Sequence, residues 1–199
     1  MLFAEQGYDG WTMKELATRA ECAVGLLYRY YPSREALVLA LYAELAQSLE
    51  ARASALGAGT VGARFVELVG WKLAELDRRP RAFRALARAA LSPDDGARVL
   101  GDETKHVRAV GVRAFTEVVS HATNAPADAA PLGRVLYGLH LLVVLVWTQR
   151  RRRDETLSDA LAELAPLLDL AVMASSTPLF APALARVDAL ARSLLEDFS

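Results

Sequence analysis

Apolar residues recur three and four positions apart along almost the whole chain, whereas the apolar–polar alternation of a half-buried β-strand is nearly absent. Such spacing gathers apolar side chains on one face of a helix. Prolines fall between the periodic segments, where a residue without a backbone N–H is tolerated, except that Pro166 falls within one. The pattern predicts an all-α fold, with helices over 1–6, 13–20, 24–30, 34–56, 61–78, 81–91, 95–123, 131–152, 157–174 and 182–197.

The composition fits a globular protein with a sizeable core. Hydrophobic residues make up 53% of the 199 residues and charged residues 24%, which argues against disorder. Lysine and arginine (23) nearly balance aspartate and glutamate (24), so no overall positive field attracts the chain to nucleic acid. Any DNA binding must therefore come from the local placement of charges.

Cysteine usage and hydropathy indicate the compartment. The single cysteine, Cys22, cannot form an internal disulfide, and the first residues lack the basic start and long apolar core of a secretory signal. The most apolar run, 135–147, has 13 residues, against the roughly 20 needed to span a bilayer. We therefore expect a cytoplasmic protein with no membrane segment, in which this run is a buried helix.

The segment 12–41, TMKELATRAECAVGLLYRYYPSREALVLAL, predicts two short helices, a tight turn between them and a long third helix. Thr12 can cap the first helix, with Glu15 completing a capping box. Pro32 ends the second helix and Ser33 caps the third. This arrangement indicates a helix-turn-helix unit, whose second helix can enter the DNA major groove, although an ordinary helical hairpin has the same outline.

The longer stretch LFAEQGYDGWTMKELATRAECAVGLLYRYYPSREALVLAL resembles the N-terminal domain of the tetracycline-repressor-like (TetR) family of transcriptional regulators. The landmarks are LFAEQGY, TMKELATRA, the glycine at Gly25, LYRYYPSREAL and the long helix that follows, over about the first fifth of the chain. The resemblance implies a helix-turn-helix DNA-binding domain over 1–45 and a larger effector-binding and dimerisation domain over 46–199. It also implies a homodimeric, ligand-responsive repressor that a small lipophilic effector releases from a palindromic operator in double-stranded DNA.

The same resemblance implies the residues that contact DNA. Thr12 and the amides of its helix would face phosphates, Arg34 would pair with a phosphate, and Gly25 would lie close to the DNA. Tyr28 would touch the DNA backbone. The DNA-binding residues implied in this way are Thr12, Lys14, Ala23, Val24, Gly25, Leu26, Tyr28, Arg29, Tyr30 and Arg34.

The expected reading helix departs from the family pattern, which commonly has Gly-Val-Ser at the turn and Gly-Thr beyond it. Ala23 cannot cap the helix or bond a phosphate, and Val24 and Leu26 offer only apolar contact, for instance to a thymine methyl. Glu21 would repel phosphates if it points outward. Residues 1–45 carry four basic and six acidic side chains, a formal net charge of −2, so nonspecific DNA affinity should be weak. The first helix also looks truncated, and the alternative function is a TetR-like dimeric ligand-binding or interaction module that has lost sequence-specific DNA binding.

The predicted helix 131–152 is apolar on nearly all sides, so it should be buried on two of them. A partner subunit is the simplest cover for the second side. The helix 157–174 would pair beside it and complete an intersubunit four-helix bundle. A central core helix of a monomer is the alternative.

Aromatic and polarisable residues on the middle helices are candidates for the effector pocket. They could line an apolar cavity with a few polar groups, or they could simply pack the core, as a lone histidine on an apolar face often does. The ligand-binding candidates are Phe65, Trp71, Phe83, Phe115, Tyr137, His140 and Trp147.

The remaining polar motifs give little support to catalysis. The three histidines and one cysteine are scattered, without an HExxH, a CxxC or a glycine-rich phosphate loop. His106 and His121 would lie roughly 22 Å apart along one helix, too far to share a metal. We expect no enzyme, no metal and no cofactor. Four consecutive arginines, 150–153, would complement the negative end of a helix, with binding of a phosphate or an acidic partner as the alternative.

Overall fold

The computed structural model describes residues 5, 10–91, 101–149, 155–175, 177 and 179–196. These residues form helices and contain no strand, so the predicted all-α class is confirmed. The helices are α2 (Met13–Arg19), α3 (Val24–Tyr30), α4 (Arg34–Ser54), α5 (Val61–Asp77), α6 (Pro80–Leu91), the 3-10 turn η1 (Asp102–Thr104), α7 (Lys105–Ser120), α8 (Ala130–Gln149), α9 (Glu155–Ser175) and α10 (Ala181–Glu196).

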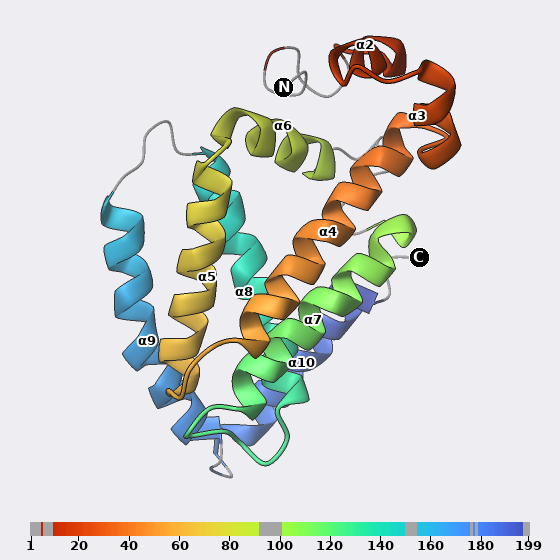
Figure 1. Ribbon diagram of the computed structural model, residues 1–199. Helices are drawn as coiled ribbons and strands as arrows, with labels where there is room; N and C mark the ends of the chain where they lie inside the picture. The colour runs from red at the N-terminus through yellow and green to blue at the C-terminus, as the bar shows by residue number, and fades with distance from the viewer. Residues whose placement is uncertain are drawn as a thin grey trace.

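The two short helices α2 and α3 lie at one end of the molecule, and the long helix α4 runs from them into the remaining helices (Figure 1). We call α5 to α10 the body. Within it, α7 packs along α4 and α8, α9 packs on α5, and α10 packs on α8. Helices α7 and α10 therefore both lie beside α8, whereas α9, the neighbour expected from the sequence, packs mainly on α5.

The main core lies where α4, α5, α7 and α8 meet. Phe65 and Leu68 of α5, Phe115 of α7 and Leu136 of α8 are fully buried there. Gly111 of α7 lies directly against the Tyr137 ring of α8, where a Cβ atom would clash. The absence of a side chain at Gly111 thus allows α7 and α8 to pack closely.

Helix boundaries agree with the sequence prediction to within a few residues, with one exception. The single helix predicted over 95–123 is wrong at residues 101–104, where the chain bends at Gly101 and forms the 3-10 turn before α7 begins. The guanidinium of Arg108 donates hydrogen bonds to the Gly101 carbonyl (2.6 Å) and to the Thr104 hydroxyl (2.8 Å), which holds the bend. The predicted helix 1–6 apart from Glu5, the segment 95–100, the arginines 150–153 and the chain end beyond 196 lie outside the described residues.

Helix α8 is the one described helix that is long and apolar enough to cross a membrane by length and composition, with a mean hydropathy of 1.6 over its most apolar window. It extends beyond the 13-residue apolar run of the sequence, from 130 to 149. It packs against α5, α6, α7 and α10, and it buries its central residues in the main core. This packing accounts for part of its apolar composition, since 39% of that window is buried and Leu142 and Val146 remain exposed.

The start of α5 is fixed against α9 and the loop before α8. The backbone amide of Val61 donates to the Asn124 side chain (2.8 Å), and that of Gly62 donates to the Asp169 carboxylate (2.9 Å). These acceptors satisfy amides that the first turn of a helix leaves without partners. A Cβ atom at Gly62 would clash with the backbone of Ala165 in α9, just before Pro166. The close approach of α5 and α9 therefore depends on glycine at position 62.

Replacing Gly62 by alanine should lower the free energy of unfolding by about 1–3 kcal/mol, because the added methyl group overpacks the α5–α9 contact. Gly70→Ala is the matched control in the same helix, since a Cβ atom there meets nothing within 4 Å. It should raise the free energy of unfolding by about 0.5–1 kcal/mol through helix propensity. Urea unfolding followed by circular dichroism measures both, and equal effects would contradict the contact.

Candidate functional site

The first helix of the helix-turn-helix unit, α2, begins with the capping box expected from the sequence. The Glu15 amide donates to the Thr12 hydroxyl (3.2 Å), and the Thr12 amide donates to the Glu15 carboxylate (2.7 Å). Both residues are exposed. The cap fixes where α2 starts, and it engages the hydroxyl group of Thr12.

The turn between α2 and α3 is closed by a left-handed residue. Glu21 has a φ of 53°, in the region that favours glycine. The Cys22 amide donates to the Ala17 carbonyl (3.0 Å) and the Glu21 amide donates to the Thr18 carbonyl (3.2 Å), which is the pattern of a Schellman motif. The side chain at Glu21 thus occupies a strained position, and it is exposed on the turn that precedes the reading helix.

The reading helix α3 packs against the protein along one side and is exposed along the other. Leu27 and the following Tyr31 pack on a small core formed by Trp11 and Met13. No residue of α3 is fully buried. Its N-cap is Ala23, which makes no side-chain hydrogen bond to the helix, as predicted. The orientation of α3 therefore rests on apolar contacts along one side.

The structure leaves most of the DNA-binding candidates exposed on α2 and α3. Tyr30 is 70% exposed, Tyr28 48% and Leu26 45%, which are large values for such side chains. A Cβ atom at Gly25 would meet nothing within 4 Å, so internal packing does not require glycine there. Val24 and Arg34 are half-buried; the exposed candidates are Thr12, Lys14, Ala23, Gly25, Leu26, Tyr28, Arg29 and Tyr30.

Two of the four cations near this surface are engaged within the protein. Arg19 forms a two-pronged ion pair with Glu5 (2.6 and 2.9 Å), and its hydrogen bond lowers the pKa of that carboxyl group. Arg34 lies over the Trp11 ring at 5.8 Å and 3.9 Å from the Glu35 carboxylate. Lys14 and Arg29 make no ion pair with the described residues, so they carry most of the positive charge that DNA can meet.

Four of the seven ligand-binding candidates meet in the interior of the body. The ring centroids of Phe65 and Phe115 are 5.7 Å apart, and Phe115 lies 5.1 Å from His140 and 6.1 Å from Tyr137. These rings come from α5, α7 and α8, and all four residues are buried. We call them the interior ring cluster. The sequence identified its members, although it did not show that they touch.

Two buried polar side chains in the body, His140 and Lys72, make few or no hydrogen bonds with the described residues. Both ring nitrogens of His140 are without a hydrogen-bond partner among the described residues, and an unsatisfied buried donor or acceptor costs about 1–3 kcal/mol. Burial, together with the charge of Lys72, lowers the pKa of His140 to about 3, so the ring is neutral. Burial also lowers the pKa of Lys72 to about 8, against the opposing effect of Glu75.

Lys72 was absent from the sequence-based candidates. It occupies a position of α5 between the buried residues Val69 and Leu76, and its own side chain is buried. Its ammonium group has one weak contact, 3.5 Å from the Leu45 carbonyl of α4. A lysine in the apolar stripe of a helix is the signal that could have identified it.

The other three ligand-binding candidates lie elsewhere. The Trp147 indole donates to the Asp77 carboxylate (2.9 Å), and the Arg84 guanidinium lies over its ring at 5.4 Å. Trp71 is half-buried at the edge of the main core. Phe83 of α6 contacts the same core and also lines a groove on the opposite face of α8.

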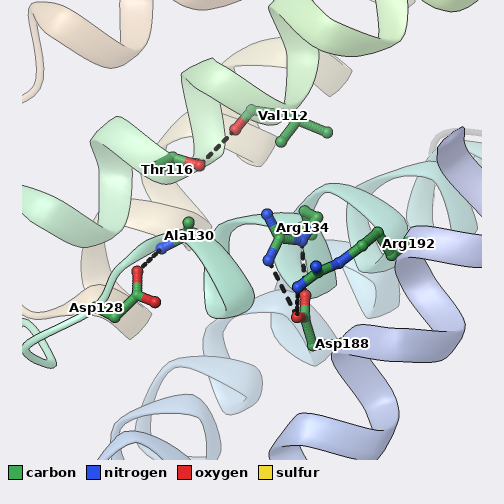
Figure 2. A network of polar contacts seen from close by, with 7 residues as sticks. All are labelled: Val112, Thr116, Asp128, Ala130, Arg134, Asp188 and Arg192. Atoms are coloured by element: carbon green, nitrogen blue, oxygen red, sulfur yellow. Dashed lines mark hydrogen bonds and ion pairs between the residues drawn. The ribbon is translucent and has the colours of Figure 1, made fainter.

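That groove has a volume of about 660 Å³ and is bounded by α4, α6, α8 and α10. Its walls are almost entirely apolar and include Leu142 of α8 and Leu190 of α10, both largely exposed. We call it the outer groove. Asp188 of α10 holds its wall in place, because it accepts hydrogen bonds from Arg134 of α8 (2.6 and 3.0 Å) and Arg192 (2.6 Å) (Figure 2).

Comparisons with known proteins extend the likeness beyond the first helices. Residues 1–41 match the family described as "Bacterial regulatory proteins, tetR family". The HTH-type transcriptional repressor KstR of Mycolicibacterium smegmatis is 30% identical over 147 residues, covering 73% of this chain and 70% of the relative. The repressors of the same name from Mycobacterium tuberculosis (29% over 147 residues, 73% and 65% covered) and Rhodococcus jostii (28% over 155 residues, 75% and 69% covered) are also similar.

The exposed helix α3, supported by α2 and α4, defines a helix-turn-helix DNA-binding protein. The chain belongs to the tetR family of bacterial regulatory proteins, and it is a ligand-responsive transcriptional repressor that binds operator DNA inside the cell. This family consists of regulators, which agrees with the expectation that the chain is not an enzyme.

Replacing Glu21 should separate backbone strain from charge at the turn. Glu21→Gly should raise the free energy of unfolding by about 1 kcal/mol, because glycine adopts the left-handed conformation without a Cβ clash. Both Glu21→Gly and Glu21→Gln should bind DNA more tightly at low salt, since each removes a negative charge near the phosphates. Thermal unfolding and fluorescence anisotropy measure the two effects. A stabilisation by glutamine equal to that by glycine would refute the strain.

Proposed function

We propose that this protein is a cytoplasmic, homodimeric repressor that reads a palindromic operator through α3 and is released by a small lipophilic effector bound in the body. Residues 1–45 would form the reading domain and residues 46–199 the effector and dimerisation domain. The observation that carries the proposal is α3 itself, which packs on Trp11 and Met13 along one side and leaves its other side exposed.

The exposed groups of α2 and α3 suggest how the operator is read. Arg29 and Tyr30 can reach base edges or phosphates, and Lys14 can pair with a phosphate. Leu26 can contact a thymine methyl group. Gly25, with open space around it, permits close approach of the backbone to DNA. Specificity would therefore rest on a few contacts and on shape, with little nonspecific attraction.

The outer groove supports dimerisation through α8 and α10. Exposed apolar side chains on both helices face the same groove, and burying them against a second copy removes them from water. A two-fold axis through this surface would bring α8 and α10 of each subunit together as a four-helix bundle. The sequence favoured 131–152 with 157–174 instead, and α9 does expose Leu167, Leu170 and Met173.

Helix α4 supports a route from the effector to the reading heads. Its start belongs to the helix-turn-helix core through Leu37, and its end belongs to the main core through Leu49. The Tyr42 hydroxyl also donates to the Leu86 carbonyl of α6 (3.0 Å). An effector held against the interior ring cluster would favour a different position of α4 and so change the distance between the two reading heads. Half-sites about one DNA turn apart would then no longer be matched.

Arg29→Ala should weaken operator binding about 5- to 150-fold, because one arginine contact to a base or phosphate contributes roughly 1–3 kcal/mol. Fluorescence anisotropy should be measured on DNA from upstream of the chain's own coding sequence, with a shuffled fragment alongside. Arg78→Ala is the matched control, since Arg78 is an exposed arginine of the body. Equal binding to both fragments would instead favour the dimeric module without sequence-specific recognition.

Leu142→Glu should give a monomeric mass in light scattering at micromolar concentration, because it places a charge in the proposed α8–α10 interface. The same variant should bind the operator more weakly, since two half-sites are no longer engaged together. Leu170→Glu changes an equally exposed leucine of α9 and should remain dimeric. A monomer from Leu170→Glu with a dimer from Leu142→Glu would assign the interface to α9.

A further inference from the structure

A second cavity lies between the helix-turn-helix unit and the body. Its volume is about 490 Å³, and its walls come from α2, α4, α6 and the residues that flank α2 and α3. Small-molecule sites in proteins typically enclose roughly 300–1,000 Å³. We call this cavity the α2–α6 cleft. It is distinct from the outer groove, although Phe83 and Leu86 of α6 border both.

Three aromatic side chains line the α2–α6 cleft. Trp11 and Tyr31 belong to the small core that supports α3, and Phe83 belongs to the apolar cluster that joins α6 to α4. Tyr31 and Phe83 are only half-buried, so their rings retain surface that a ligand can cover. Aromatic rings pack on one another in stacked or edge-to-face pairs. A lining of this kind, with rings from both the reading unit and the body, favours a ligand that is itself aromatic.

Two opposite charges without protein partners border the same cleft. Glu44 lies on α4, one turn beyond Leu41, and Arg79 lies just before α6. Both side chains are exposed, and neither forms an ion pair or a side-chain hydrogen bond with the described residues. The third charged group of the lining, Arg19, is already paired with Glu5. The cleft therefore offers one carboxylate and one guanidinium beside its aromatic rings.

We propose that the α2–α6 cleft binds an aromatic α-amino acid, whose ring packs against Trp11, Tyr31 and Phe83. Its carboxylate would pair with Arg79 and its ammonium group with Glu44. An aromatic acid without an amine would leave Glu44 unpaired beside a second carboxylate, and an aromatic amine would leave Arg79 unpaired beside a second cation. This site is additional to the effector site of the proposed function and does not rest on it.

The walls of the cleft show what such a ligand would do. Trp11 and Tyr31 move with the helix-turn-helix unit, because they share a core with α2 and α3. Phe83 and Leu86 move with α6, because they pack with Val38 of α4. A ligand held between the two sets would favour the arrangement of reading unit and body that fits it best. The orientation of α3 would then respond to an amino acid as well as to the effector.

The test is isothermal titration calorimetry of the full chain, without DNA, with L-tryptophan, indole-3-propionate and tryptamine as probes. L-Tryptophan should bind about two- to fivefold more tightly than either of the others, as expected for ion pairs at partly exposed sites. Glu44→Gln should remove its advantage over indole-3-propionate, and Arg79→Gln its advantage over tryptamine. Arg78→Gln, a change at an exposed arginine outside the lining, should keep both advantages.

A second readout locates the site in the wild-type protein. The chain has three tryptophans, and unlabelled L-tryptophan should shift the ¹H–¹⁵N resonance of the Trp11 indole while leaving those of Trp71 and Trp147 in place. Equal affinity for the three probes, no binding of L-tryptophan up to millimolar concentration, or shifts at Trp71 or Trp147 instead would each overturn the proposal. Operator anisotropy is measured separately, so loss of DNA binding would count against the proposed function and leave this site standing.

Discussion

The arrangement of the whole molecule depends on α4, because this one helix takes part in three separate apolar clusters. Leu37 packs with Trp11 and Met13 in the helix-turn-helix core, Val38 packs with Leu86 of α6, and Leu49 and Ala53 belong to the main core. A rigid helix shared in this way transmits displacement, since packed interfaces shift between discrete arrangements rather than deform smoothly. The reading helix therefore cannot be positioned independently of the body.

The polar groups divide into those that fix the architecture and those that remain without partners. Arg108, Asp188 and Asp169 are hydrogen-bonded from several sides and hold α7, α10 and α5 in place. Lys72 and His140 are buried at a junction of three helices with almost no hydrogen bonds. Natural proteins pair most buried polar groups, so such exceptions tend to mark places where function and stability compete.

Local features of this chain could be predicted from the sequence because local chemistry determines them. The caps at Thr12 and Ser33 and the missing cap at Ala23 follow from residue type and position alone. The bend at Gly101 could not be predicted from the spacing of apolar residues. It is stabilised by a hydrogen bond from the side chain of Arg108, and that spacing carries no information about such a contact. The packing of α9 on α5 could not be predicted either, because it depends on a contact between Gly62 and the backbone of Ala165, far apart in the sequence.

Some features of the candidate site could likewise be predicted from the sequence, and others could not. The aromatic residues of the interior ring cluster were recognised by residue type. Their contacts with one another could not be predicted, because they join α5, α7 and α8, which are far apart in the sequence. The burial of Lys72 depends on the same long-range packing, although its place among apolar neighbours in the sequence could have drawn notice.

The ion pair between Arg19 and Glu5, together with the packing of Arg34 on Trp11, has a consequence for how the protein searches a genome. Few cations are left to displace counterions from DNA, so the affinity should vary little with ionic strength. Such a protein is held weakly by bulk chromosomal DNA, and a larger share of its molecules diffuses freely. Occupancy of the operator would then track the concentration of protein and ligand more closely than the salt content of the cell.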